Sequence, residues 1–489
     1  MLAAARRLGR ELARIRSGQD EPAPELVRAA IRDVITHCIY GVDKNPLAVD
    51  LCKVALWIEA HTEGKPLTFL DHRIRCGDSL LGVFDLAALK HGIPDDAFNP
   101  VSGDDKSAAT AAKRQNREER AGIRELPFQP AQQLHHLADA ARQLDQLPDD
   151  HPEHIRAKQQ LYHSICHSPE AVRQRTAANL WTAAFFQPLA SREQRTANPA
   201  PLITTGALAD WLDGQPIDAR LTAHANARAA QLRFFHWPLE FPEVFVQGGF
   251  DVILSNPPWE RIKLQEQEFF ATRDQRIAAA PNKAARQRLI DQLQQTNPAL
   301  AAEFASAKHE HEAASKFVRA SNRFPLTAVG DVNTYALFAE LAARLLAPNG
   351  RAGIIVPTGI ATDDTTKRFF QHIVATKSLV SLFGFDNTWR IFPAVHPDTP
   401  FALLTLGHSD SPIEFAHYLL DTAHLRDSRR RFTLSPDDFA LLNPNTRTCP
   451  VFRTRADADL TRAIYRRVPV LVNETTGQNP WGFKGLLMF

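Results

Sequence analysis

Cysteine is scarce and unpatterned in this chain of 489 residues. There are five, an odd number in which no two form a CxxC pair: Cys38, Cys52, Cys76, Cys166 and Cys449. A disulfide framework and a zinc site are therefore both disfavoured, and the usage is typical of a reducing cytoplasm. The sequence also lacks a signal peptide and any apolar run of membrane-spanning length. We therefore expect a cytoplasmic protein with no membrane association and no metal site.

An excess of one charge is missing as well. The chain has 57 basic and 55 acidic residues, for a net charge of +2. This balance excludes the acidity of a disordered tail and the basicity of a histone-like binder. A nucleic-acid partner would have to be bound by a local basic face. The length predicts two or three domains.

A strand–turn–helix unit of an α/β sheet is present near the start, in CIYGVDKNPLAVDLCKVALWIEAH. Residues 39–42 form a short apolar strand with Asp43 at its carboxyl end. Asn45 is suited to cap the next helix and Pro46 to its first turn. A second short strand follows in RIRC and ends at Gly77-Asp78-Ser79. One face of the helix is apolar, with Leu47, Leu51, Val54, Ala55 and Ile58.

The pattern then changes along the chain and divides it into four expected regions. Residues 1–86 form the first part of an α/β core. Residues 87–247 are rich in Ala, Gln, Arg and Glu with helical periodicity, so we expect a helical insertion. The α/β pattern resumes over 248–410, and 411–489 mixes short strands with a helix. Strands that alternate with helices predict a mostly parallel, doubly wound sheet.

Within the resumed pattern, the elements are well marked. We expect strands at 250–254 and 352–357, and in LVSLFGF and FALLTLG. An amphipathic helix is predicted from Thr334 to Leu346, followed by a turn at Asn349-Gly350.

One loop has unusual chemistry for a strand end. The strand FDVIL stops at Asn256-Pro257-Pro258-Trp259, where neither proline has an N–H to donate and both have fixed φ. The Asn256 side-chain oxygen and the Pro257 carbonyl are acceptors that could hold an exocyclic amino group, and Trp259 offers a flat surface to a planar heterocycle. A base in a duplex would have to be flipped out to reach them. The alternative is a proline turn whose tryptophan fills the core.

Two aspartates are expected at the same edge of the sheet as this loop. Ligands of doubly wound sheets bind at the carboxyl ends of the strands, where Asp43, Asp78 and the loop all lie. Asp43 is suited to bind both ribose hydroxyls of a nucleoside, and Asp78 to accept from an adenine amino group. The alternative for either aspartate is a helix cap or a turn residue.

These motifs match a known family. VDKNP, GDSL and FDVILSNPPW resemble, in that order, the second, third and fourth motifs of the amino-group-methylating DNA methyltransferases, most closely the adenine-N6 type. FHWPLEFPEVF, GDVNTYALFAELAARLLAPNGRAGIIVP and NPNTRTCPVFRTRADADLTRAIYRRVPVL resemble the large methylases of type IIG restriction–modification and of BREX- or DISARM-like phage defence. The resemblance implies a Rossmann-like S-adenosylmethionine-dependent methyltransferase sheet with a large helical insertion.

The resemblance assigns roles to the loop. Asn256 and Pro257 would accept from the N6 amine of a flipped adenine. Pro258 would hold the loop and Trp259 would stack on the base. The amine would attack the methyl group directly, with no covalent enzyme intermediate, so that catalysis would rest on positioning and electrostatics.

It also implies a cofactor and partners. Asp43 would bind the ribose of S-adenosylmethionine and Asp78 its adenine, with Lys44 and Ser79 beside them in the cofactor site. The implied substrate is double-stranded DNA, and other restriction or defence subunits are the implied protein partners.

The chain departs from the family pattern in one respect. The first motif, a strand followed by a Gly-x-Gly loop, should precede Asp43, but Gly9 and Gly18 there stand alone. We therefore expect the central first strand to be missing, and the target-recognition domain to lie beyond Phe489. The uncapped helix from Leu2 and the apolar ending KGLLMF also suggest an internal fragment. Such a fragment is expected to show weak or no methylation alone.

The sequence also leaves other functions open. A non-catalytic DNA-binding or interaction subunit of a defence complex is the main alternative. Glutamine-N5 protein methyltransferases share an Asn-Pro-Pro loop but are small and lack the insertion. C5-cytosine methylation is excluded because no cysteine follows a proline. The basic run RDSRRRF, Arg426 to Phe432, is either a phosphate contact or an exposed linker.

Overall fold

The computed structural model describes residues 1–122, 130–190 and 201–484. The chain forms two compact units. Unit 1 comprises Met1–Gln247 and Leu264–Ser321, and unit 2 comprises Gly248–Lys263 and Asn322–Phe489. The apolar ending KGLLMF lies outside the described residues from position 485 onward. Each unit has its own sheet.

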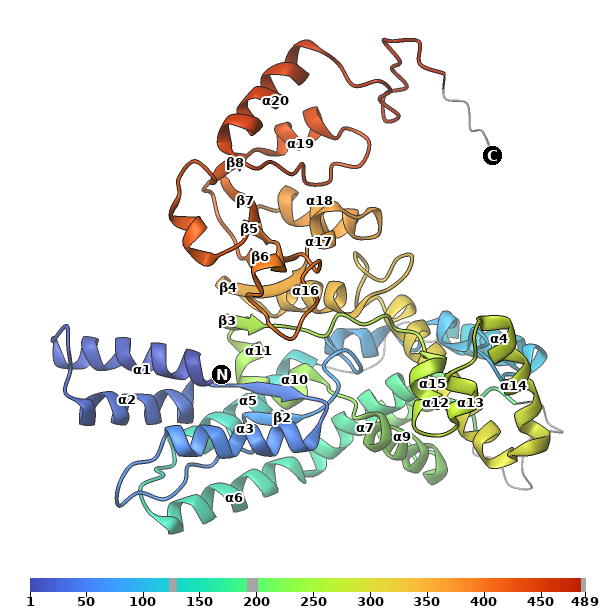
Figure 1. The fold of residues 1–489 in the computed structure, drawn as a ribbon. Helices are drawn as coiled ribbons and strands as arrows, with labels where there is room; N and C mark the ends of the chain where they lie inside the picture. The colour runs from blue at the N-terminus through green and yellow to red at the C-terminus, as the bar shows by residue number, and fades with distance from the viewer. Residues whose placement is uncertain (123–129, 191–200, 485–489) are drawn as a thin grey trace. The chain divides into compact units, whose positions relative to one another are not determined.

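Unit 1 contains a two-stranded parallel sheet, in which β1 (Gly41–Asp43) pairs with β2 (Ile74–Cys76). The helix α3 (Pro46–Glu59) follows β1 directly, and its predicted cap is confirmed, because the Asn45 side chain accepts from the Leu47 N–H at 3.0 Å. Two further helices, α1 (Leu2–Ser17) and α2 (Pro24–His37), pack side by side (Figure 1). Together these elements enclose a small apolar core.

The apolar face of α3 is not part of that core. Leu51 is 69% exposed, and Leu47, Val54 and Ile58 are exposed as well. The buried residues of α3 are Val49 and Leu56, which lie on another side of the helix. The sequence pattern identified the apolar face correctly, but nothing in the described chain covers it.

The rest of unit 1 is helical. Short 3-10 turns at η1 (Leu86–His91) and η2 (Asp95–Phe98) lead into the helices. The α-helices are α4 (Lys106–Gly122), α5 (Pro130–Gln146), α6 (Pro152–Cys166), α7 (Pro169–Ala183), α8 (Thr205–Leu212), α9 (Ala219–Leu232), α10 (Trp237–Glu240), α11 (Pro242–Val246), α12 (Glu266–Ala271), α13 (Gln275–Ala278), α14 (Lys283–Thr296) and α15 (Pro298–Ala320).

Buried polar contacts tie these helices to the small sheet. The Arg73 guanidinium, just before β2, donates to the Asp145 carboxylate of α5 at 2.7 Å. The Tyr40 hydroxyl, just before β1, donates to Glu243 of α11 at 2.9 Å. Arg73 also lies 4.5 Å above the Tyr40 ring. The helical part and the small sheet therefore form one body.

Unit 2 contains a six-stranded sheet with the strand order β3-β4-β6-β5-β7-β8. The four strands predicted between residues 250 and 407 are all present in it. Two neighbouring pairs are parallel, β3 with β4 and β5 with β7, and the other three are antiparallel. The strands are β3 (Phe250–Ser255), β4 (Leu346–Pro357), β5 (Leu379–Phe385), β6 (Phe401–Leu406), β7 (Ile413–Leu419) and β8 (Phe432–Leu434).

This arrangement corrects the predicted sheet in two ways. The strands lie in two sheets and not in one, and the larger sheet is mixed, where a mostly parallel one was expected. The connections explain the mixture. A parallel neighbour usually requires a helical crossover, whereas strands joined without an α-helix can pair antiparallel. Only the one-turn η4 (Asn387–Trp389) lies between β5 and β6, and only the short η5 (Thr422–Arg426) between β7 and β8.

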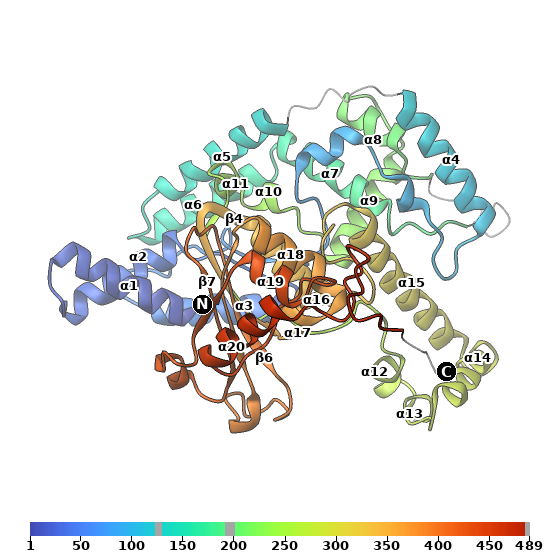
Figure 2. The same ribbon diagram turned by 90° about the horizontal axis from the view of Figure 1, so that it is seen from above.

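The side chains of the larger sheet alternate between its two faces. One face carries Ile354, Leu382 and Leu404, which join a large core cluster with the helices. The helices of unit 2 are α16 (Thr334–Leu345), α17 (Gly359–Thr362), α18 (Lys367–Ala375), α19 (Pro436–Leu442) and α20 (Arg455–Arg467), with η3 (Asp364–Thr366) before α18. Figures 1 and 2 show α16, α17 and α18 along one side of the strands. The other face is covered by loop residues such as Phe392 and Leu425.

The predicted turn at Asn349-Gly350 lies inside β4 in the structure. Phe250 pairs with Leu346 and Val252 with Arg351, so β4 carries a large bulge between these two positions. Gly350 is required there, since a Cβ would lie 2.6 Å from the Phe250 carbonyl oxygen. Strand β4 therefore begins at Leu346, before the apolar run at 352–357 that predicted it.

Candidate active site

The Asn-Pro-Pro-Trp loop follows β3 at one edge of the six-stranded sheet. Because β3 and β4 are parallel, the loop lies at the edge where β4 also ends, at Pro357. Pro257 is buried, whereas Asn256 and Pro258 are exposed. The loop is therefore anchored by one proline and presents its neighbours to solvent.

Helix α16 holds this loop through a residue that had no role in the sequence analysis. The Thr334 hydroxyl donates to the Pro258 carbonyl at 2.7 Å and accepts from the Glu260 N–H at 3.0 Å. The Thr334 N–H donates to the Glu260 carbonyl at 2.8 Å. The one available signal was its place at the predicted start of a helix, where hydroxyl side chains often make local bonds.

Two hydrogen-bond acceptors of the loop are open to a ligand. Among the described residues, no donor reaches the Asn256 side chain or the Pro257 carbonyl oxygen, whereas the Pro258 carbonyl is used by Thr334. The two prolines have no N–H and therefore offer no backbone donor to these acceptors. The Asn256 side-chain oxygen and the Pro257 carbonyl thus stay open to an external donor.

Trp259 is partly buried at this edge. Its ring packs against the core clusters of both sheet faces. Its indole N–H is buried without an acceptor in the described chain, which costs about 1–3 kcal/mol when nothing replaces the lost hydrogen bond. The indole thus contributes to packing, and its stacking on a base stays a prediction.

The predicted cofactor residues lie together in unit 1. Asp43 ends β1, and its Oδ1 accepts from the Asn45 N–H at 2.7 Å. The Lys44 ammonium lies 2.8 Å from Asp78 Oδ2, and Asp78 Oδ1 accepts from the Leu80 N–H at 3.1 Å. Both aspartates therefore shape turns, and their roles in cofactor binding stay predictions. Asp43 Oδ2 has no partner in the described chain.

An aromatic segment supports the turn that contains Asp78 and Ser79. The Ser79 carbonyl accepts from the Trp237 indole N–H at 3.0 Å. A Cβ on Gly77 would lie 2.4 Å from the Phe235 ring, so only glycine fits there. The segment FHWPLEFPEVF carried part of the family resemblance, but its support of this turn was not predicted.

The predicted site residues therefore follow strands of two sheets. Asp43 and Asp78 follow the strands of the small sheet, and Asn256 to Trp259 follow β3 of the large sheet. The structure brings Lys44 and Asp78 into contact, and it joins the loop to Thr334.

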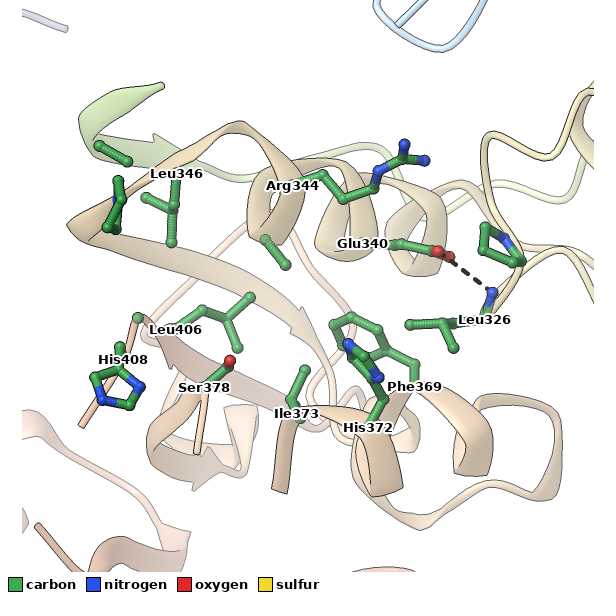
Figure 3. Close-up of a pocket in the computed structure, with 15 residues that line it drawn as sticks. Leu326, Glu340, Arg344, Leu346, Phe369, His372, Ile373, Ser378, Leu406 and His408 are labelled. Carbon is green, nitrogen blue, oxygen red and sulfur yellow. Dashed lines mark hydrogen bonds between the residues drawn. The ribbon is translucent and has the colours of Figure 1, made fainter. Parts of the chain in front are cut away.

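A cavity of about 450 Å³ lies at the other end of the large sheet. It is lined by Leu346 at the start of β4, Ser378 before β5 and Leu406 at the end of β6. Figure 3 shows the buried Glu340 beside it, with a hydrogen bond to the Leu326 N–H. Burial raises the pKa of Glu340. This cavity is at the edge opposite the Asn256 loop and contains none of the predicted site residues.

Neither a metal cluster nor a membrane span is present in the part of the chain that the structure describes. No three histidine, cysteine, aspartate or glutamate side chains there lie close enough together to hold a metal ion. No helix in residues 1–122, 130–190 or 201–484 is both long and apolar enough to cross a membrane.

The chain belongs to the Eco57I restriction-modification methylase family, whose model matches residues 37–287, just over half of its length. The match includes Asp43, Asp78 and the loop at Asn256. The comparison with curated proteins yields no match.

Several solved structures of restriction–modification enzymes are distantly similar. The type IIG restriction endonuclease BpuSI is 13% identical with a TM-score of 0.20, and the match covers 66% of this chain and 40% of that one. A type I methyltransferase subunit from Streptococcus thermophilus is 13% identical with a TM-score of 0.23, over 92% of this chain and 94% of that one. The type ISP enzyme LlaGI, solved with a DNA substrate mimic, is 11% identical with a TM-score of 0.20, over 70% and 34%. This chain thus spans less than half the length of BpuSI and LlaGI.

Proposed function

We propose that this chain carries the catalytic residues of an S-adenosylmethionine-dependent DNA methyltransferase that modifies the N6 amine of adenine. The observation that carries the proposal is the loop after β3. Asn256 and Pro257 present unused acceptors, and Thr334 fixes the loop through the Pro258 carbonyl at 2.7 Å.

The chemistry follows from the acceptors. An exocyclic amine has two N–H groups, and two fixed acceptors that bind both of them orient its lone pair away from the ring. The Asn256 amide oxygen and the Pro257 carbonyl supply such a pair. The target base must leave the duplex to reach them, and it then lies beside Trp259. The contribution of the loop is positioning and electrostatic stabilisation.

The residues of unit 1 fit part of the cofactor. S-adenosylmethionine supplies an electrophilic methyl group on a sulfonium. The open Oδ2 of Asp43 is suited to accept from a ribose hydroxyl. Asp78 is suited to accept from the adenine amine, and Lys44, which now lies 2.8 Å from it, would balance its charge. Ser79 shares the same turn.

We also propose how the regions contribute. Residues 1–86 and 248–410 would supply the methyltransferase core, 87–247 the helical insertion, and 411–489 the start of a linker or target-recognition region. The substrate would be double-stranded DNA, in restriction–modification or in a BREX- or DISARM-like phage defence, with other subunits of such a system as partners.

The test is an allele exchange in the natural host. Genomic nucleosides are measured by mass spectrometry in strains with the intact gene, with Asn256→Ala, and with Asn349→Ala as a control at an exposed asparagine of the same unit. We expect N6-methyldeoxyadenosine to disappear at one sequence motif only with Asn256→Ala. Loss of N4-methyldeoxycytidine instead would overturn the adenine assignment. No change in any methylated base would overturn catalysis and favour a non-catalytic subunit.

A further inference from the structure

Strand β7 contains an irregularity that changes the face on which its side chains lie. Phe383 of β5 pairs with Ala416, and Phe385 pairs with Leu419, so one residue of β5 faces two of β7. Phe415 belongs to the core cluster on one sheet face, whereas Leu419 belongs to the cluster on the other. In a regular strand these two residues would share a face, so the bulge inserts one extra residue.

At the bulge, the side chain of His417 is buried and that of Tyr418 is exposed to solvent. His417 is buried, and its imidazole occupies the space beside Gly384, where a Cβ would lie 2.8 Å from its Nδ1. Tyr418 is 47% exposed and has a φ of 56°, in the left-handed region that an aromatic residue rarely adopts. Backbone strain of this kind is found where a side chain must be held in an unusual direction.

An arginine lies on the exposed tyrosine. The Arg453 guanidinium carbon is 5.0 Å from the centre of the Tyr418 ring. The segment that carries Arg453 runs beside the basic run noted in the sequence, since the Arg455 N–H donates to the Arg429 carbonyl at 2.8 Å and its Nε to the Arg431 carbonyl at 3.2 Å. Two stretches that are far apart in the sequence thus form one surface.

This arginine surface consists of Arg429, Arg430, Arg431, Arg453 and Arg455, with Tyr418 at its edge. Two of its cations are neutralised, Arg429 by Asp427 at 2.9 Å and Arg431 by Glu414. The other three form no ion pair with the described residues. Arg453 and Arg455 are exposed, and Arg430 is partly exposed. The surface therefore has an uncompensated positive charge although the whole chain is nearly neutral.

Tyr418 and the Asn256 loop lie at the same edge of the sheet. Strands β3 and β4 are parallel, β6 is antiparallel to both β4 and β5, and β7 is parallel to β5. Strands β3 and β7 therefore run in the same direction. Tyr418 lies near the carboxyl end of β7, and Asn256 follows the carboxyl end of β3.

We propose that the arginine surface binds the phosphate backbone of duplex DNA beside the target base, an assignment that rests on the proposed function. Arginine presents a planar fork of donors that matches phosphate oxygens, and such contacts fix the position of a protein on DNA without reading its sequence. Duplex DNA is the partner whose dense negative charge complements several unpaired arginines at once. Tyr418 holds the Arg453 guanidinium flat and outward.

The test measures duplex binding at several salt concentrations. The probe is a fluorescein-labelled 30-base-pair DNA, and the readout is anisotropy with the full chain. In the triple variant Arg430→Glu, Arg453→Glu, Arg455→Glu, we expect affinity to fall by at least about a hundredfold. The slope of log K against log salt should become shallower by about two to three, at about 0.9 for each lost phosphate contact.

A matched control carries the same change in charge elsewhere. Arg10, Arg114 and Arg368 are exposed and lie outside the arginine surface, and their triple replacement by glutamate should change affinity by less than about threefold, as expected of charges that do not contact the DNA. Equal losses in the two triple variants would show a general charge effect and overturn the proposal. Wild-type affinity in the first variant, or no DNA binding by the unaltered chain, would overturn it as well.

A variant of Tyr418 separates the backbone strain at this residue from its role in DNA binding. Glycine adopts a left-handed backbone freely, so Tyr418→Gly should keep the melting temperature within about 2 °C of the original or raise it, while DNA affinity falls by about tenfold. A lower melting temperature with unchanged affinity would show that Tyr418 only packs. The catalytic assignment is read separately, from the N6-methyldeoxyadenosine of the Asn256→Ala strain, so a failure of the surface and a failure of the catalytic assignment give different results.

Discussion

The two sheets of this protein begin from the same local plan and end in different states. In each, a short strand stops at a polar loop, Asp43 after β1 and Asn256 after β3. Apart from its edge strand β3, the large sheet is covered on both faces, by helices on one and by loop residues on the other. The small sheet has only two strands, and the apolar face of its helix α3 is exposed.

The comparison of the two sheets shows that a strand–loop–helix pattern in the sequence determines the local turn. It does not determine what covers the apolar face of the helix or strand. The Asn45 cap forms between residues that are two positions apart. Covering α3 requires apolar partners from a distant part of a chain. Strand β3 shows the same contrast, since it is an edge strand on which Val252 and Leu254 are exposed. The loops of both sheets are thus well defined while two apolar surfaces beside them are open.

The largest effect is expected from two leucines of α3. Leu56 is 1% exposed and Leu51 is 69% exposed. Leu56→Ala should lower the free energy of unfolding by about 2–5 kcal/mol, and Leu51→Ala by less than about 0.5 kcal/mol. Chemical denaturation monitored by circular dichroism measures both. Equal losses would mean that the apolar face of α3 is covered, and the contrast between the sheets would disappear.

The large sheet should show a dependence on pH through His417. Burial lowers the pKa of His417 to about 4, from an ordinary value near 6.5. The folded state therefore binds this proton less readily than the unfolded state does. Its contribution to stability is complete above pH 6.5 and is lost as the pH falls towards 4, by about 3 kcal/mol.

The measurement is denaturation at a series of pH values. His417→Gln should weaken the dependence between pH 6.5 and 4, although the variant is less stable throughout. His408→Gln serves as a control, because that histidine is exposed in the segment that follows β6 of the same sheet. An unchanged slope in His417→Gln would contradict the buried, neutral imidazole.

The cofactor half of the comparison is tested at Asp43. Asp43→Asn keeps an oxygen for the Asn45 N–H but removes the charge that would bind a ribose hydroxyl. We expect the affinity for S-adenosylmethionine to fall by about 10- to 100-fold, as for the loss of one or two charge-assisted hydrogen bonds. Calorimetric titration measures it. Binding equal to that of the unaltered chain would remove Asp43 from the site.

The catalytic half is tested at Thr334, a positioning residue. Thr334→Val removes the hydroxyl that holds the Pro258 carbonyl and should lower kcat for methyl transfer by about tenfold, as for the loss of one hydrogen bond, with KM for DNA unchanged. Thr334→Ser keeps the hydroxyl and should restore the rate. A serine variant as slow as the valine variant would show that the methyl group of Thr334, and not its hydrogen bond, matters.

The smallest effect is expected at Lys44. Its ammonium contacts Asp78 at 2.8 Å, but its side chain is 64% exposed. Exposed ion pairs contribute little, so Lys44→Met should change the melting temperature by less than about 2 °C. A larger fall in melting temperature would show that the ion pair between Lys44 and Asp78 stabilises the small sheet in spite of its exposure to solvent.

Much of the local structure could be predicted from the sequence. The strands LVSLFGF and FALLTLG appear as β5 and β6 with nearly the predicted bounds, and the helix from Thr334 is α16. Apolar runs bounded by turn residues identify such elements because their hydrogen bonds and burial are locally determined. The predicted turn at Asn349-Gly350 became a bulge within β4, since pairing with β3 extended the strand past it.

The sequence by itself determined the polar loops, their donors and acceptors, and the family to which the chain belongs. Only the tertiary structure decided that the strands divide between two sheets, that Thr334 fixes the loop, and that Tyr418 is turned outward over a bulge. The physical reason is the distance along the sequence between the residues that interact. Caps, proline geometry and side-chain chemistry are fixed by adjacent residues, whereas strand order, bulges and burial depend on segments that meet only when the chain is folded.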